Sequence, residues 1–495
     1  MSRAILDLAL AMRRDAGYLM VALVSIAGLR LLHYFHSFFF HWPRYRQLQP
    51  ITTDDILTLS DIPFIKVQIT TRGAFGSTEV IRRGIQHIIE LANEAPNFYG
   101  RKLSVEVVTE SYEQKCILEQ DFSRASLHVQ GFVVPAQYQT PKGTQLKARA
   151  LHYMVELRRL RVNHKPGRTV IVHYDEESVM LPDEMRKLID YLAKTDKKLT
   201  EGPIHYPLEY LDASLICRAM EAHRPLGCFE CREVMERGTP IHMHGSNLVI
   251  DEDLENELGW DIGNLDGQPF VAEDYVFGVF AYLYCGSQVF GWHGCVMLEQ
   301  PPFSFKSAFK QRYRWTIGVL QGMAAMRRIP QFHYLSWKMR FQMRWGTWYR
   351  ILTFTLGLPT GIIALPYLLY QAIALLGGHA SLSLPLPLMI WMTLVGFLWL
   401  NSIFIGTWYN LTSSDEMSFL RRWIEGAKVL TVAPLAGILE SAAASWAVLQ
   451  WMLGNRKVSW QPTPKTKAAE ETRMARPGAI AVSRQLDHAH RGLEW

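Results

Sequence analysis

The chain has 495 residues, of which 49% are hydrophobic and 20% are charged, and its formal net charge at pH 7 is +6. This length has room for about three average domains. So small a net charge does not indicate a nucleic-acid partner, because anionic lipid headgroups or nucleotide phosphates are enough to match it. The six cysteines are expected to be reduced thiols rather than a disulfide framework.

The first apolar segment predicts a membrane anchor. Residues 18–42 are almost wholly apolar or aromatic and exceed the ~20 residues that a spanning helix needs. The run ends in phenylalanines followed by Arg44 and Arg46 instead of a small-residue cleavage site, so we expect it to be retained. Residues 1–45 are therefore predicted to be an N-terminal transmembrane anchor.

The middle of the chain predicts strands that alternate with helices. This pattern indicates a mainly parallel sheet, whose ligands lie at the carboxyl ends of the strands. We therefore expect residues 60–300 to form a Rossmann-like α/β domain. The expected strands are 65–69, 103–108, 131–134, 169–173 and 241–251, and the expected helices are 77–91, 145–157 and 270–284.

The last third of the chain predicts helices at a membrane. Residues 301–345 are basic and aromatic-rich, which is typical of amphipathic interfacial helices. Residues 351–376 and 384–409 contain no Asp, Glu, Lys or Arg, so residues 346–410 are predicted to hold two transmembrane helices. Basic residues flank these two segments but are missing from their connection, so the positive-inside rule places the middle domain in the cytoplasm.

The segment after these spans allows two readings. Residues 429–453 are apolar enough to cross a bilayer, but they contain Glu440, which is costly at a bilayer centre. We predict that residues 411–456 form an interfacial or re-entrant helix, and the alternative is a further span. Residues 468–495 are predicted to be disordered.

Carboxylates gather at two points of the middle domain. Asp175 and Glu177 leave a strand two positions apart, so both can enter one crevice and share Mg²⁺ or Mn²⁺ with substrate phosphates. The alternative is a solvated acidic turn. Asp274 follows Glu273 at the expected start of a helix, where it can act as a general base or as a helix-capping carboxylate.

Basic and aromatic residues also gather at two points. Lys147 and Arg149 begin a helix after a turn, where cations and exposed amides can meet phosphate oxygens. They can equally be ordinary surface charges. Within the run Gln311, Arg314 and Trp315, the guanidinium can neutralise a leaving diphosphate and the indole can stack on a sugar ring. Interfacial anchoring of a helix is the alternative.

A paired-thiol motif gives a weaker signal. Cys228 and Cys231, followed by His242 and His244, contain the residue types of a zinc site. The spacing of the histidines is irregular, so we expect an ordinary loop and strand here.

In this order, the motifs resemble the processive, membrane-embedded branch of family-2 glycosyltransferases, which includes cellulose, hyaluronan and mannan synthases. The resemblance covers about residues 60–465. It implies a glycosyltransferase-A catalytic domain embedded between transmembrane helices. The matching residues are Asp175 and Glu177 for the D-x-D-like metal motif, Glu273 and Asp274 for the base, and Gln311, Arg314 and Trp315 for Q-x-x-R-W.

Shorter strings are most similar to the Egghead type of β-mannosyltransferase. They are Thr71-Arg72-Gly73, the run from Lys147 to Leu151, the string from His173 to Ser178, and Pro302-Phe303. This likeness implies that Thr71, Arg72 and Glu110 lie near the nucleotide. The chain departs from the family at Glu177, where many members carry Asp, and it shows one predicted span ahead of the catalytic region.

Residues 457–467 are similar to the gating loop of the synthases, which closes over bound nucleotide from the cytoplasmic side. The residues that this likeness assigns to the substrate are Trp460, Thr463 and Lys465. If residues 429–453 crossed the membrane, Trp460 would lie on the side away from the donor. This is the reason for preferring an interfacial helix.

The resemblance implies an inverting, metal-dependent transfer of a hexosyl unit from a nucleotide sugar to a glycan or glycolipid acceptor, forming a β-linkage. GDP-mannose is the favoured donor, and a UDP-glucose-dependent β-glucan or other exopolysaccharide synthase is the alternative. A non-catalytic membrane protein that binds nucleotide or glycan is less favoured, and a transporter lacks repeated halves. The expected partners are membrane lipid and, for polymer export, a homo-oligomer or an export protein.

Overall fold

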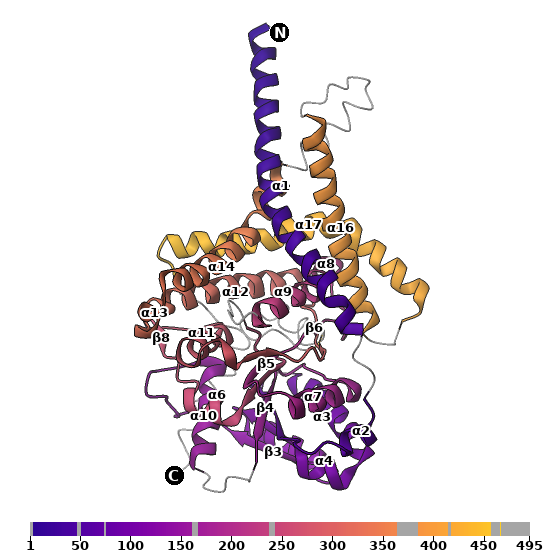
Figure 1. The fold of residues 1–495 in the computed structure, drawn as a ribbon, viewed down its shortest axis with the longest axis vertical. Coiled ribbons are helices and arrows are strands. Elements are labelled where there is room, and N and C mark those ends of the chain that lie inside the picture. The colour runs from indigo at the N-terminus through magenta and orange to yellow at the C-terminus, as the bar shows by residue number, and fades with distance from the viewer. Residues whose placement is uncertain are drawn as a thin grey trace.

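The structure is a computed structural model that describes residues 3–46, 51–73, 76–160, 167–236, 243–363, 385–413, 417–456 and 466. An α/β domain forms one end of the molecule. Helices α1 (Arg3–Arg46) and α16 (Leu386–Thr412) extend from it side by side (Figure 1). The predicted gating-loop residues Trp460, Thr463 and Lys465, and the tail 468–495, lie outside the described residues.

The central sheet has seven strands in the order β10-β5-β7-β4-β1-β2-β3. Strand β7 runs antiparallel to β4 and β5, and the other pairs are parallel. The expected mainly parallel sheet is therefore confirmed. The strands are β1 (Phe64–Thr70), β2 (Leu103–Thr109), β3 (His128–Val133), β4 (Thr169–Tyr174), β5 (Leu199–Glu201), β7 (Leu248–Asp251) and β10 (Phe290–Trp292). Two small sheets pair β6 (Ile204–His205) with β11 (Met297–Leu298) and β8 (Asn264–Leu265) with β9 (Gln268–Pro269).

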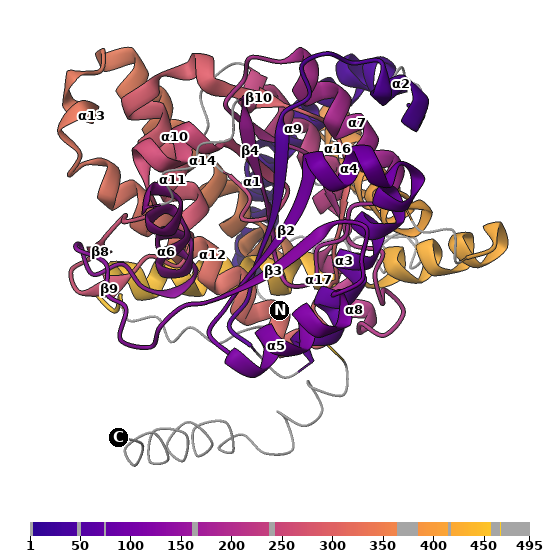
Figure 2. The same ribbon diagram turned by 90° about the horizontal axis from the view of Figure 1, so that it is seen from below.

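Helices cover both faces of the sheet (Figure 2). Those of the α/β domain are α2 (Thr53–Leu57), α3 (Ser77–Glu94), α4 (Pro96–Lys102), α5 (Tyr112–Asp121), α6 (Leu146–Leu160), α7 (Pro182–Lys194), α8 (Leu215–Met220), α9 (Arg224–Glu236), α10 (Glu252–Leu258), α11 (Glu273–Cys285) and the 3₁₀ helix η1 (Ser287–Val289). The membrane-facing side adds α12 (Phe305–Met326), α13 (Pro330–Tyr334), α14 (Trp337–Thr355) and α17 (Phe419–Met452).

The side chains of β1 alternate between the two faces of the sheet, and they meet different surroundings on each face. Ile65, Val67 and Ile69 project to one face and are buried among apolar side chains of α3 and α7. Gln68 projects to the other face, where its side-chain oxygen accepts a hydrogen bond of 2.9 Å from Arg158 of α6. Along β1, one side of the strand therefore packs into an apolar core, and the other takes part in a polar network.

That network centres on Glu255, which is fully buried. Its carboxylate accepts hydrogen bonds from Arg158 and from the indole nitrogen of Trp260, the latter at 2.6 Å, and lies 2.9 Å from His173 Nε2. Burial opposes ionisation, but Arg158 and His173 outweigh it and lower the pKa of Glu255 to about 2. A buried charge is tolerated here because it is paired and hydrogen-bonded.

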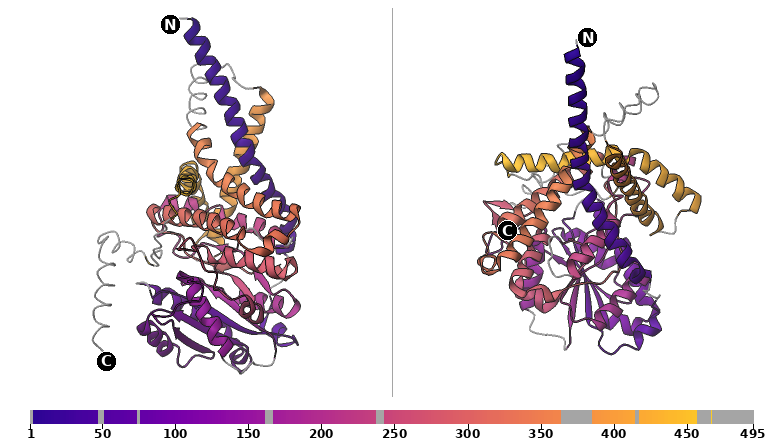
Figure 3. Two further views of the ribbon diagram at one scale, coloured as in Figure 1. Left: turned by 90° about the vertical axis from the view of Figure 1, so that its left-hand side faces the viewer. Right: turned by 45° about the horizontal axis from the view of Figure 1, so that its top comes forward.

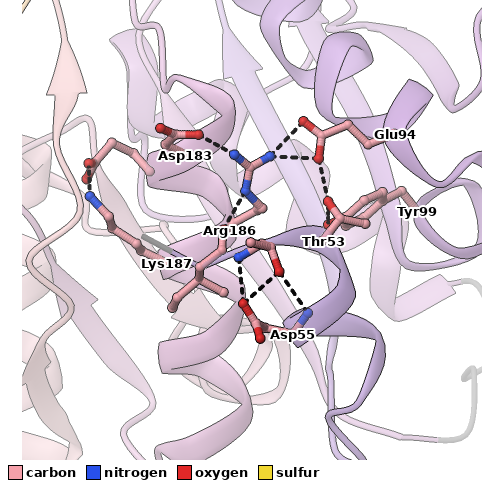
Figure 4. Close-up of polar contacts among 10 residues, drawn as sticks. Thr53, Asp55, Glu94, Tyr99, Asp183, Arg186 and Lys187 are labelled. Atoms are coloured by element: carbon pink, nitrogen blue, oxygen red, sulfur yellow. Dashed lines mark hydrogen bonds and ion pairs between the residues drawn. The ribbon is translucent and has the colours of Figure 1, made fainter. Parts of the chain in front are cut away.

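Hydrogen bonds and ion pairs around α2 hold the segment after α1 against the α/β domain (Figure 4). Arg186 of α7 donates to both carboxylate oxygens of Glu94 at 2.6 and 2.7 Å and to the carbonyl oxygen of Ile51 at 2.7 Å. Thr53 of α2 also donates to Glu94. These contacts fix where the chain from α1 enters the α/β domain.

Three described helices are long and apolar enough to cross a membrane: Gly17–Phe39 within α1, α16 and α17. The predicted span at 384–409 lies in α16. For the predicted span at 351–376, α14 ends at Thr355, helical residues continue to 363, and the remainder lies outside the described residues.

Helix α17 runs across the direction of α1 and α16, and the left view of Figure 3 shows it nearly end-on. It has 34 residues and is thus about 51 Å long. Near its start Glu425 pairs with Arg218 of α8, and just beyond its end Arg456 lies 2.8 Å from Asp266. Both ends therefore contact the same α/β domain.

Sequence and structure differ at several elements. The third strand begins at His128 instead of 131, and β7 begins at Leu248 instead of 241. Helices α5, α7 and α9 were not expected. The Cys228–Cys231 segment, for which a loop and strand were expected, lies within α9, because its apolar residues pack into the core beside β10 and β6.

Candidate active site

A cavity of about 990 Å³ opens at the carboxyl ends of β1, β2 and β4 and reaches the membrane-facing helices. This is the edge where a parallel sheet presents its ligand site. The structure brings together eleven residues predicted from the sequence. They are Thr71, Arg72, Glu110, Lys147, Asp175, Glu177, Glu273, Asp274, Gln311, Arg314 and Trp315.

The carboxylates after β4 meet a lysine. Lys147, in the first turn of α6, donates hydrogen bonds to the Asp175 carboxylate and, at 2.8 Å, to the carbonyl oxygen of Gly245. Burial opposes the charge of Lys147, but Asp175 and Glu273 outweigh it and raise its pKa. Lys147 is thus a site residue rather than an ordinary surface charge.

Glu110 lies between two arginines. Its carboxylate accepts a hydrogen bond of 2.7 Å from Arg149 and one of 3.3 Å from Arg72. Arg149 also donates to the carbonyl oxygen of Tyr138 at 3.1 Å, and it is not among the cavity-lining residues. Arg149 therefore holds Glu110 from outside the cavity, whereas Arg72 and Glu110 line the cavity.

Glu299 is a site carboxylate that the sequence did not reveal. It lines the cavity, is buried, and accepts hydrogen bonds from the hydroxyls of Ser178 and Ser246. Burial raises the pKa of Glu299 to about 8, and the negative charges of Glu177 and Asp175 add to the effect. Negative charge is therefore concentrated at this end of the cavity.

Asp274 lies in the first turn of α11, next to Glu273. Burial raises the pKa of Asp274 to about 7, with a further contribution from Glu273, while Lys147 acts in the opposite direction. The residue at the N-cap of α11 is Ala272, and its side chain makes no capping bond. A carboxyl with a pKa near neutrality, facing a cavity, has the properties of a general base.

Arg314 faces this acidic region from α12. Burial lowers the pKa of Arg314, and the negative charges of Glu273, Asp175, Asp274 and Glu177 act in the opposite direction. A guanidinium here lies where a leaving diphosphate would need a counter-charge.

Trp315 contacts cations. The guanidinium carbons of Arg224 and Arg312 lie 4.3 and 4.4 Å from the centre of its ring. Arg224 also donates a hydrogen bond of 2.6 Å to the hydroxyl of Tyr206. The indole that the sequence suggested as a sugar platform is held by two guanidiniums, and it still borders the cavity.

Within the part of the chain that the structure describes, Cys228 and Cys231 do not belong to a metal-binding cluster. Cys228 and Cys231 are buried in α9, burial raises the pKa of both thiols, and all six cysteines of the chain are free. Among the described residues, no group of three or more His, Cys, Asp or Glu side chains is arranged to hold a metal ion by itself. His242 lies outside the described residues.

Comparison with known proteins identifies the fold. Residues 170–400 match the family described as glycosyl transferase family group 2. Residues 170–400, just under half of the chain, therefore resemble a family-2 glycosyltransferase domain. This confirms the expected glycosyltransferase and its α/β fold class. Membership of the processive, synthase-like branch stays a prediction.

The glycosyltransferase has curated relatives in animals. It is 27% identical over 260 residues to the β-1,4-mannosyltransferase egh of Drosophila melanogaster, covering 52% of each chain. It is 26% identical over 196 residues to the β-1,4-mannosyltransferase bre-3 of Caenorhabditis elegans, covering 39% of this chain and 41% of the relative. The chain thus spans about half the length, or less, of the curated relatives it matches.

Two solved structures resemble the glycosyltransferase more distantly. One is the mannosyltransferase PcManGT from Pyrobaculum calidifontis in complex with GDP-Man and Mn²⁺, with 15% identity, a TM-score of 0.41, and coverage of 79% of this chain and 100% of that chain. The other is TarS 1–349 of S. aureus, with 10% identity, a TM-score of 0.32, and coverage of 79% and 91%. Likeness at this level concerns the fold alone.

The sequence did not reveal five residues of the site. Tyr206, Arg224 and Glu299 come from segments without a recognisable motif, and their side chains meet the site only through tertiary packing. Arg312 lies inside the Gln311–Trp315 motif at a position to which no role was assigned, and Glu440 was expected only as a membrane-surface carboxylate.

Proposed function

We propose that this enzyme transfers a mannosyl unit from GDP-mannose to a hydroxyl of a glycan or glycolipid acceptor and forms a β-linkage. The observation that carries the proposal is that one cavity gathers the acidic pair Asp175 and Glu177, the candidate base Asp274 and the cation Arg314. Similarity to two β-1,4-mannosyltransferases supports mannose as the sugar.

The reaction is a single displacement. The acceptor oxygen forms a bond to the anomeric carbon as the bond from that carbon to the diphosphate oxygen breaks, so an α-linked donor yields a β-linked product. Asp274 takes the proton of the attacking hydroxyl, and burial beside Glu273 makes its carboxylate a stronger base. Arg314 offsets the charge that develops on the departing GDP.

The acidic residues fit a divalent cation. Asp175 and Glu177 offer hard oxygen ligands, and Mg²⁺ or Mn²⁺ is commonly held by one or two carboxylates together with substrate phosphates. The concentration of negative charge that raises the pKa of Glu299 is what such a cation would offset. When bound, it would neutralise the donor diphosphate.

The walls of the cavity support an acceptor with an apolar part. Beyond Trp315 the cavity continues between helices that face the membrane, where Phe354, Met389 and Ile438 line it. These side chains come from α14, α16 and α17. A glycolipid could place its sugar beside Asp274 and its apolar chain along this wall.

We also propose that α17 lies at the membrane surface and that the catalytic domain is cytoplasmic. The ion pairs at both ends of α17 support this, because a spanning helix would carry one end away from the domain. A side chain built on Gly76 would approach Thr466 Oγ1 to 3.1 Å, so Thr466, a residue of the gating-loop-like segment, lies beside the start of α3. From there the segment can reach a donor near Thr71.

The test uses purified protein in detergent with Mn²⁺, dodecyl β-D-glucoside as acceptor, and GDP-mannose or UDP-glucose as donor. We expect GDP release and a mannosylated product with GDP-mannose, lost in Asp274→Asn but kept in the control Asp183→Asn, whose side chain is 69% exposed on α7. Turnover of UDP-glucose instead would establish the glucan-synthase alternative. Turnover of neither donor, with cellobiose also supplied as acceptor, would overturn the proposal.

A further inference from the structure

Helix α12 carries two arginines that face opposite ways. Residues two apart on an α-helix are separated by about 200° around its axis. Arg314 faces the site carboxylates, so Arg312 faces away from them, towards α8 and α17. Trp315, three residues after Arg312, shares its side of the helix.

Arg312 is almost fully buried, at 4% exposure, and its guanidinium bridges three segments. Its Nε donates to Glu440 of α17 at 2.7 Å, and its Nη2 donates to Glu221, directly after α8, at 2.7 Å. Its Nη1 donates to the side-chain oxygen of Gln311 at 2.9 Å. Only a planar guanidinium can meet two carboxylates in this way while lying against an indole.

Glu440 is the α17 end of this bridge. Its side chain is 16% exposed, and it also borders the cavity. The pairing with Arg312 explains a carboxylate in this apolar helix, because a buried charge requires a partner. Removing Glu440 would leave Glu221 as the only carboxylate of the bridge, and Arg312 would still lie next to the repelling charge of Arg224.

We propose that Glu440 is a positioning residue for the transfer reaction, which fixes Arg312 from α17 and through it orients Trp315 at the membrane-facing side of the cavity. This rests on the proposed function. On the donor side, the hydrogen bonds of Lys147 and Glu110 lead to Asp175, Gly245, Arg72 and Arg149, whereas those of the bridge lead to Glu221, Glu440 and Gln311. Glu440 therefore acts on use of the acceptor and leaves binding of the nucleotide unchanged.

The experiment compares Glu440→Gln with the matched control Glu425→Gln. Glu425 is also an α17 carboxylate paired with an arginine, but its partner Arg218 lies on α8 instead of α12. With GDP-mannose and dodecyl β-D-glucoside, we expect Glu440→Gln to lower kcat/KM for the acceptor by about 5- to 50-fold, the range expected for coupled contacts. Binding of GDP with Mn²⁺, measured by calorimetry, should change less than about twofold.

A double-mutant cycle tests the route through Arg312. In an Arg312→Met background, Glu440→Gln should cause no further loss, because the interaction is already gone. If the losses of activity from Glu440→Gln and Arg312→Met multiply in the double variant, the route through Arg312 is overturned. A Glu440→Gln enzyme that behaves like Glu425→Gln, or that loses GDP binding in parallel with transfer, would overturn the proposal itself.

Hydrogen exchange separates this proposal from the proposed function. In the protein without donor, Glu440→Gln should raise amide exchange across residues 311–315 above the level in Glu425→Gln. Unchanged exchange would overturn the role of Glu440. If the wild type uses neither donor but exchange still rises, the proposed function fails and the positioning contact stands.

Discussion

Replacing Lys147 with methionine should shift the pH dependence of transfer to higher pH. In the wild-type site, burial and Glu273 raise the pKa of Asp274 to about 7, and Lys147 acts against both. A base works only when ionised, so activity is lost as pH falls through this pKa. About a tenth of Asp274 is ionised one pH unit below its pKa and about nine-tenths one unit above, so kcat/KM should fall roughly tenfold per unit below pH 7.

Lys147→Met removes a buried opposite charge, which typically shifts a carboxyl pKa by about one unit or more. In a plot of kcat/KM against pH, the rising part of the curve should therefore move from near pH 7 to about pH 8. The assay measures kcat/KM for GDP-mannose from pH 5.5 to 9.5, because this ratio reports the free enzyme. Two results would refute Asp274 as the base. One is a rise of kcat/KM at the same pH in Lys147→Met as in the wild type, and the other is a wild-type kcat/KM that does not change across pH 7.

Three further predictions concern metal, stability and packing. Asp175→Asn should weaken Mn²⁺-dependent GDP binding by about tenfold or more, and calorimetry giving unchanged affinity would contradict the metal role. Glu255→Ala should lower the free energy of unfolding by about 3–5 kcal/mol in a denaturant titration, because it removes the buried carboxylate that pairs with Arg158. Gly278→Ala should cost about 1–3 kcal/mol in the same titration, since its new methyl group would overlap Met243, and a Met243→Ala second change should restore part of the loss.

Much of the sheet and several site residues could be predicted from the sequence. The runs that became β1, β2 and β4 are apolar and β-branched, and the motif residues Asp175, Asp274 and Arg314 follow or begin predicted elements. A polar residue at a strand end or a helix start is placed by local rules, so its neighbourhood is predictable. Short strands such as β5 and β10 contain too few residues for an alternation of apolar and polar residues to be recognised.

The amino-acid sequence by itself determined the α/β fold class and the motif residues of the site, because alternating apolar periods and acidic or basic motifs are local properties. Only the tertiary structure decided which partners complete the site. Glu299 meets Ser178 across 121 residues of chain, and Arg312 meets Glu440 across 128. Such contacts depend on how distant helices and strands pack, and buried charges must find partners wherever the fold places them.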